Sequence, residues 1–270
     1  MKVLFFCPIW GSADLTFEDF AAKAKDAGYD GVEIDLPQDA EKKSSILKVL
    51  DDMGLSMIAQ HWETSDLDLQ THKNNYEKRL YNLAEANPLF INSQTGKDHF
   101  PFDANCELIE LAKKVSESTG VTIFHETHRG KFSFAAHVTR RYLDHFDDLR
   151  LSLDISHWCC VAESLLEDQT QAVSLALSRT DHIHSRIGFA EGPQIPDPRV
   201  DMWKETLDQH LCWWDQVIKR ARDEGREFFT ITPEFGPFPY MQIHPETNLP
   251  LTNQWDVNVF MKNLLNERYN

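Results

Sequence analysis

Short runs of apolar residues alternate along this chain with longer stretches in which apolar residues recur every three or four positions. The short runs are typical of buried strands, and the longer stretches are typical of helices with one buried face. The predicted strands cover residues 3–7, 31–36, 56–62, 89–92, 121–126, 151–155, 182–184 and 228–234. The predicted helices cover residues 16–27, 46–53, 67–86, 103–119, 137–146, 162–178, 202–222 and 257–265. Eight strands alternating with eight helices predict an α/β fold, the (β/α)8 TIM barrel.

Residues at the ends of these segments support the same division. Thr16, with Asp19 three positions later, resembles a capping box, and Asp103 is expected to cap the fourth helix. Gly28 and Gly120 follow the last apolar position of their helices. A doubly wound open sheet is the competing fold, but the chain has no G-x-G-x-x-G turn. No linker or repeat divides the sequence, so residues 1–270 are expected to form a single domain.

Composition narrows the classes of partner. The chain has 43 acidic and 27 basic residues and a net charge of -16, which disfavours nucleic acid and anionic membranes. Its five cysteines show no C-x-x-C spacing, which favours a reducing compartment over a disulfide framework. The sequence shows neither a signal peptide nor an apolar run long enough to span a bilayer. We therefore expect a cytoplasmic protein.

Polar residues that can carry chemistry follow the predicted strands. Asp154 ends an apolar strand and His157 stands three positions later, although a buried carboxylate is unfavourable unless something compensates its charge. The other strand ends are similar and carry Trp10, Glu33, His61, Glu126, His184 and Glu234. In a barrel, side chains at these ends converge on the site of chemistry.

Four of these residues fall on the last four strands. Glu126, Asp154, His184 and Glu234 would place three carboxylates and an imidazole around one point. This donor set suits a single divalent cation, Mn²⁺, Mg²⁺ or Co²⁺, with Zn²⁺ as an alternative. His182 shares the inward phase of His184, so either histidine could be the ligand, and His184 is favoured because it lies nearer the strand end.

Several motifs resemble the xylose-isomerase-like barrel superfamily, which includes sugar phosphate isomerases and epimerases, ketose 3-epimerases and hydroxypyruvate isomerases. The motifs are Gly31-Val32-Glu33, Phe124-His125-Glu126, Asp154-x-x-His157, His182-Ile183-His184-Ser185-Arg186 and Pro233-Glu234-Phe235-Gly236. The resemblance implies metal ligands at Glu126, Asp154, His184 and Glu234, and a substrate contact at His157. The family arginine lies several residues beyond the histidine of strand seven, whereas Arg186 is only two beyond it.

The predicted chemistry is proton transfer next to a carbonyl group. A metal-stabilised enediolate would form, with Glu126 and Glu234 taking and returning the proton. Proton transfer on opposite faces of the carbon gives epimerisation, and transfer on one face gives aldose–ketose isomerisation. Arg186 either orients a substrate oxygen or forms a salt bridge with a ligand carboxylate. Further candidates for contact with a small polyhydroxylated substrate are Glu33, His61 and Trp10, each of which has an equally plausible structural role.

Other functions fit parts of the same pattern. A dehydratase of the inosose type would use the same chemistry, and a sugar-binding barrel without catalysis would be expected to lack one of the two glutamates. The related AP endonucleases need a basic groove, which the net charge disfavours. Two proline-rich segments, residues 188–201 and 237–255, would form flaps over the barrel mouth or contacts in a homodimer or homotetramer.

Overall fold

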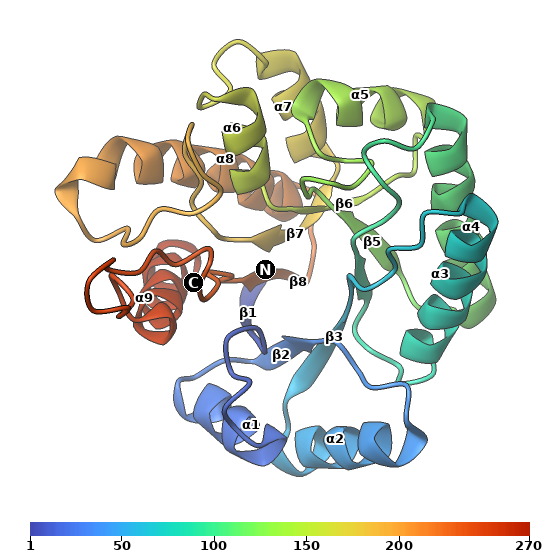
Figure 1. Cartoon of the computed structure of the whole chain (residues 1–270), viewed down its shortest axis with the longest axis horizontal. Coiled ribbons are helices and arrows are strands. Elements are labelled where there is room, and N and C mark those ends of the chain that lie inside the picture. Colours follow the sequence, from blue (N-terminus) through green and yellow to red (C-terminus); the bar gives the residue numbers. More distant parts are fainter.

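A computed structural model describes residues 1–270, and its eight strands form one closed barrel of parallel strands in chain order (Figure 1). The strands are β1 (Lys2–Pro8), β2 (Gly31–Ile34), β3 (Ser56–His61), β4 (Ile91–Ser93), β5 (Ile123–Glu126), β6 (Leu151–Leu153), β7 (Thr180–His184) and β8 (Phe228–Thr232). The barrel closes where β8 pairs with β1. The (β/α)8 fold predicted from the sequence is confirmed.

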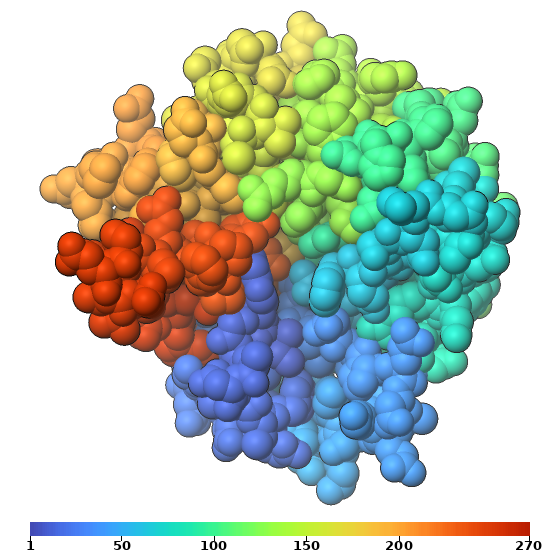
Figure 2. Space-filling view, in the orientation of Figure 1, coloured from blue at the N-terminus to red at the C-terminus, as the bar shows by residue number.

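Helices surround the strands on the outside of the barrel (Figure 1). They are α1 (Phe17–Asp26), α2 (Ala40–Met53), α3 (Leu69–Ala84), α4 (Phe102–Thr119), α5 (Ala136–His145), α6 (Ser156–Ala162), α7 (Thr170–Ser178), η1 (Asp201–Trp203), α8 (Lys204–Asp223) and α9 (Gln254–Tyr269). The space-filling view shows the chain proceeding around the molecule in sequence order, so that its last part lies against its first (Figure 2). No helix combines the length and the apolar character that crossing a bilayer requires.

Local signals in the sequence account for several helix ends. The Thr16 hydroxyl accepts a hydrogen bond from the backbone N–H of Asp19 (3.1 Å), as the capping pattern predicted. Gly54 and Gly120 follow α2 and α4 in the left-handed conformation, with φ of 65° and 74°. Residues without a Cβ adopt this conformation without strain, so each glycine marks a helix end.

Two predicted helix features are wrong. Asp103 does not cap α4, because the helix begins at Phe102 after Pro101 and Asp103 lies within its first turn. The segment 162–178 is not one helix, because α6 ends at Ala162 and Glu163 adopts φ of 52°. Apolar periodicity continues across the break, so the sequence pattern did not reveal it. The separate α6 begins immediately after β6, next to the polar end of the barrel.

The inside of the barrel is apolar only in part. Phe6, Ile58 and Phe90 form a small buried cluster, against which Leu4 and Phe124 pack. The outward faces of the strands join the helices in a much larger cluster of 57 buried residues. Inward and outward positions alternate along each strand. Residues two or four positions beyond a member of this inner apolar cluster on the same strand therefore also point inward.

Candidate active site and metal centre

Polar side chains fill the barrel at the C-terminal ends of the strands. Four ionisable residues converge there from successive strands, Glu126 from β5, Asp154 after β6, His184 from β7 and Glu234 after β8. One ligand atom from each lies within 4.8 Å of the others, and all four residues are buried. The structure thus brings together the four residues for which the sequence predicted a shared ion.

Glu33 fixes the ring of His184 by hydrogen bonds. The Nε2 atom of His184 lies 2.9 Å and 3.1 Å from the two carboxylate oxygens of Glu33. Asn92 Nδ2 (2.8 Å) and Thr232 Oγ1 (2.6 Å) also donate to this carboxylate. Because an ionised carboxylate can only accept, Nε2 of His184 carries a proton and Nδ1 faces the other carboxylates.

The Nδ1 atom of His184 is buried and has no hydrogen-bond partner. It lies 3.0 Å from Glu234 Oε2 and 3.9 Å from Glu126 Oε1, two groups that also accept rather than donate. A lone pair against carboxylate oxygens is unfavourable, so a positive group must lie between them: either a proton on Nδ1, which the raised pKa of His184 favours when no ion is bound, or a metal ion. This orphaned atom is the observation that fits a metal ion at the site.

Asp154 is fixed by the start of α6 and by Arg186. The backbone N–H of Ser156 donates to Asp154 Oδ1 (3.1 Å), and the Ser156 hydroxyl donates to the same oxygen. Arg186 contacts Asp154 Oδ2 through Nη2 and donates from Nε to Ser156 Oγ (3.1 Å). The buried guanidinium therefore compensates the charge of this carboxylate.

Arg186 also determines the tautomer of His157. Its Nη2 atom lies 2.7 Å from His157 Nε2, and an arginine can only donate. His157 Nε2 is therefore the acceptor and Nδ1 carries the proton, although Nδ1 is buried without a partner. Glu126, His128 and His157 also lie close enough to share an ion, but a protonated Nδ1 is not a ligand in this arrangement.

Electrostatics show why these groups need a cation. Burial, together with the carboxylates of Glu234 and Asp154, raises the pKa of Glu126 to about 8, although His184 opposes the shift. Burial also raises the pKa of Asp154. Burial alone would raise the pKa of Glu234, but His184 and Arg186 outweigh it and the pKa is lowered. The surrounding carboxylates outweigh burial at His184 and hold its pKa well above its usual range.

A cavity of about 430 Å³ opens directly above the cluster. It is lined by Ile9, Trp10, Asp35, Gln60, Trp62, Gln94, His128, Arg186, Glu234 and Tyr240. The Gln60 amide reaches Glu234 Oε1 (3.3 Å), and the Gln94 amide lies 3.3 Å from both oxygens of Glu126. Each of the two glutamates is thus steadied by an amide from a different strand.

The predicted substrate contacts fall in different places. Trp10 and Arg186 line the cavity, and His157 lies against them, with its ring centroid 3.9 Å from that of His128. Glu33 lies beneath His184 and does not line the cavity. His61 points out of the barrel, where Ser93 Oγ (3.1 Å) and Thr64 Oγ1 (2.7 Å) occupy both ring nitrogens.

The sequence interpretation missed Gln60, Gln94, His128 and Tyr240. A signal for Gln60 was present, because it has the same inward phase as Ile58, whereas His61 has the opposite phase. His125 faces Thr95 and Phe132 outside the barrel, as this alternation predicted. Tyr240 comes from the flap after β8 and had no such signal.

The two proline-rich segments meet at this mouth. Gln194 donates to Gly236 O (3.1 Å) and accepts from Gly236 N (2.7 Å), which joins the loop after β7 to the flap after β8. Gly236 has no side chain, and a Cβ there would lie 2.1 Å from the Trp10 ring. The absence of a Cβ lets Trp10 pack against the flap and complete one wall of the cavity.

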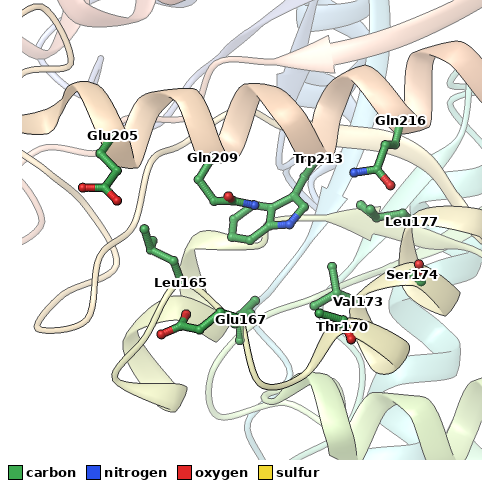
Figure 3. Close-up of a pocket in the computed structure, with 11 residues that line it drawn as sticks. Leu165, Glu167, Thr170, Val173, Ser174, Leu177, Glu205, Gln209, Trp213 and Gln216 are labelled. Atoms are coloured by element: carbon green, nitrogen blue, oxygen red, sulfur yellow. The ribbon is translucent and has the colours of Figure 1, made fainter.

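A larger groove lies elsewhere, between α7 and α8 (Figure 3). Its volume is about 610 Å³, and Val173 and Leu177 face Trp213 across it. Glu167 and Glu205 stand at one end, with no histidine or basic residue among the lining side chains. The convergence of acids and an imidazole therefore selects the barrel mouth, and not this larger groove, as the candidate active site.

Comparisons with known proteins agree on the fold. No protein-family model matches the sequence, and no curated protein matches it. Among solved structures, 3-keto-D-glucoside 4-epimerase YcjR from E. coli is 14% identical with a TM-score of 0.62, over 98% of this chain and 100% of that chain. The probable 3-DHS dehydratase AsbF, involved in petrobactin synthesis in Bacillus anthracis, is 17% identical with a TM-score of 0.60, over 98% of both chains.

A xylose isomerase domain containing protein from Salmonella typhimurium LT2 is 13% identical with a TM-score of 0.61, over 97% of both chains. Identities this low establish the fold alone. The chain has the barrel fold of the xylose-isomerase-like proteins, as its motifs predicted.

Proposed function

We propose that this protein, whose fold is that of the xylose-isomerase-like barrels, is a divalent-metal-dependent isomerase or epimerase that acts on a small sugar or hydroxy-carbonyl substrate. The observation that carries the proposal is the cluster of Glu126, Asp154, Glu234 and the unpaired Nδ1 of His184 within 4.8 Å of one another. Two ligands of one Mg²⁺-sized ion are at most about 4.2 Å apart, so the cluster needs only small adjustments.

The four residues of this cluster would hold the ion. When bound, a divalent cation polarises a carbonyl group and lowers the free energy of the negative charge that develops when the neighbouring carbon loses a proton. Mn²⁺, Mg²⁺ and Co²⁺ fit three oxygen donors and one nitrogen, and Zn²⁺ is the alternative. Glu33 would set the direction of His184, as partners of ligand histidines do.

Glu126 and Glu234 are the proposed proton-transfer residues. They come from β5 and from the end of β8, so they approach the cavity from different sides of the barrel. Gln94 and Gln60 restrict the two carboxylates, which favours a fixed path for the proton. Removal of a proton from one side of a carbon and its return to the other side would invert that stereocentre. Proton transfer on one side only would give aldose–ketose isomerisation.

His157 and Arg186 are the proposed substrate-orienting residues. The Nδ1–H of His157 is a buried donor without an acceptor, so a substrate oxygen would complete its hydrogen bonding. Arg186 lines the cavity and is itself held by Asp154 and Ser156. Arg186 thus combines the two roles that the sequence left open, a salt bridge to a ligand carboxylate and a position at the substrate cavity.

A dehydratase is the second candidate, favoured by the fold shared with the probable dehydratase AsbF. It would begin with the same proton removal and then expel a hydroxyl group. A sugar-binding barrel without catalysis is less well supported, because both glutamates are present and both lie in the cluster.

The decisive experiment measures exchange of deuterium from solvent into a panel of ketoses, aldoses and inososes, with Mn²⁺ added. Exchange at carbon is expected for at least one substrate, and Glu126→Gln or Glu234→Gln should slow it at least about 100-fold. Glu205→Gln, in the groove between α7 and α8, is the matched control and should retain the rate. Unchanged exchange in both cluster variants would overturn the proposal.

A further inference from the structure

We infer that the substrate is an uncharged polyhydroxylated molecule and not a phosphate ester, and that Asp35 enforces this choice. The inference rests on the proposed function and concerns the same cavity. Its basis is the set of charges that face the cavity, together with the hydrogen-bonding groups that remain free there. A phosphate-binding site would need free cations or a cluster of backbone N–H donors.

Arg186 is the one basic side chain among the lining residues, and it is already engaged. Its guanidinium contacts Asp154, donates to Ser156 and lies 3.8 Å from Glu234 Oε2. A phosphate group that approached Arg186 would therefore meet two carboxylates as well. The inner end of the cavity consequently offers no side-chain cation whose charge is uncompensated, and the charge of a bound divalent ion would be balanced by the carboxylates that hold it.

The nearest other cations lie outside the lining. Arg129 extends over the outer part of the mouth, with its guanidinium carbon 4.9 Å from the centroid of the Tyr240 ring. Lys131 is buried and donates from Nζ to the backbone oxygen of Trp62 (3.3 Å), behind the wall that this tryptophan forms. Neither residue is among the lining side chains, so each acts on the cavity only from behind its wall: Arg129 through Tyr240 and Lys131 from behind Trp62.

Asp35 adds a negative charge to the rim. Its carboxylate lines the cavity, and its Oδ2 atom accepts a hydrogen bond from Trp62 Nε1 (3.3 Å). Asp35 takes part in no salt bridge, so its charge is compensated only by solvent, to which it is exposed, and by the more distant Arg79. The free lone pairs of the carboxylate can accept hydrogen bonds from sugar hydroxyls, and the same charge repels a phosphate group.

The remaining walls suit a neutral sugar. Trp62 is 51% exposed although it is a large aromatic residue, and the hydrogen bond to Asp35 fixes its indole at the rim. Trp10 and Ile9 provide further apolar surface for the C–H face of a sugar ring. Gln60 and Gln94 each use Nε2 toward a glutamate, which leaves their amide oxygens to accept hydrogen bonds from substrate hydroxyls.

The test compares binding of matched sugars to the whole protein by saturation-transfer NMR with competition. The uncharged probes are D-fructose and D-tagatose, and the charged probes are D-fructose 1-phosphate, D-fructose 6-phosphate and D-tagatose 6-phosphate. The uncharged sugars should bind at least about tenfold more tightly than their phosphates. Asp35→Asn should reduce this ratio, whereas Asp52→Asn on the exposed side of α2 should leave it unchanged.

Two results would overturn the inference: phosphates that bind as tightly as the free sugars, or no detectable binding of either uncharged sugar. The outcome is separate from that of the proposed function. Selective binding of uncharged sugars without deuterium exchange in any substrate would refute the catalytic proposal and keep this one. Deuterium exchange confined to phosphorylated substrates would support the catalytic proposal and refute the inference that the substrate is uncharged.

Discussion

At the scale of single residues, the side chain that organises the site is Glu33 rather than any of the four clustered residues. It is 1% exposed, and four separate groups donate to its carboxylate, including both inward histidines of β7. Burial alone would raise its pKa, but His184 and His182 outweigh burial and hold the pKa well below its usual range. Glu33 therefore stays ionised and fixes the orientation of His184.

Glu33→Gln is predicted to weaken metal binding without unfolding the protein. The amide keeps the shape of the side chain but removes the charge that aligns His184, and loss of such a partner typically lowers metal affinity about 10- to 100-fold. Isothermal titration with Mn²⁺ measures the change, and circular dichroism checks the fold. An affinity equal to that of the original protein would show that His184 does not need Glu33.

At the scale of elements, the loop after β7 is tied to α8 by a buried histidine. His210 accepts from the backbone N–H of Gly188 (3.2 Å) and donates to Thr206 O (2.8 Å), and its ring packs near Trp214. A Cβ at Gly188 would lie 2.3 Å from Ser156 O, so this loop also lies directly against the start of α6. The connection positions the segment that follows Arg186.

His210 is predicted to make the protein less stable in acid. Burial lowers its pKa to about 4, below the usual 6.5, so the unfolded chain binds more protons between these values and stability falls as the pH drops from 6.5 toward 4. From these two pKa values, the loss between pH 7.5 and pH 5.0 is about 2 kcal/mol.

The prediction is checked by denaturant unfolding of the original protein and of His210→Gln at pH 7.5 and pH 5.0. Glutamine can donate and accept as the neutral imidazole does, but it does not titrate, so the variant should lose about 2 kcal/mol less on acidification. Other titrating groups are common to both proteins and cancel in the comparison. Equal losses in the two proteins would contradict the assignment.

At the scale of the whole molecule, the proposed ion site joins the ends of four consecutive strands, and one of them, β8, closes the barrel against β1. A cation bound by Glu126, Asp154, His184 and Glu234 would therefore link the ends of the four strands that make up one half of the barrel. Without it, buried carboxylates with raised pKa values, such as Glu126, oppose folding at neutral pH. Binding of the ion should stabilise the folded chain as a unit.

Addition of Mn²⁺ is predicted to raise the melting temperature. At about 100 times the dissociation constant, mass action gives about 2.7 kcal/mol of stabilisation, which corresponds to roughly 5–10 °C for a domain of this size. Differential scanning fluorimetry with and without EDTA measures the shift. Asp154→Asn should abolish it, whereas Glu205→Gln should retain it, and an identical shift in both variants would place the ion elsewhere.

The sequence by itself determined the barrel and the four residues that cluster at its mouth. Regular alternation of apolar segments specified eight strands and their helices, because burial of one face per segment is a local property of the chain. Polar residues at the ends of consecutive strands identified Glu126, Asp154, His184 and Glu234, since closure of a parallel barrel brings those ends together whatever the details of packing.

The tertiary structure decided which face of each strand the remaining candidates occupy and what they contact. His61 and Gln60 are neighbours on β3. The alternation in the sequence separates them, but only the structure shows that Ile58 packs inside the barrel, so that Gln60 faces the cavity and His61 contacts Thr64 outside. From its place in the sequence Arg186 could reach substrate or Asp154, and the fold pairs it with Asp154 while also placing it on the cavity wall. Tyr240 enters the cavity from a flap without periodicity, because contacts between distant segments, which no local pattern encodes, place it there.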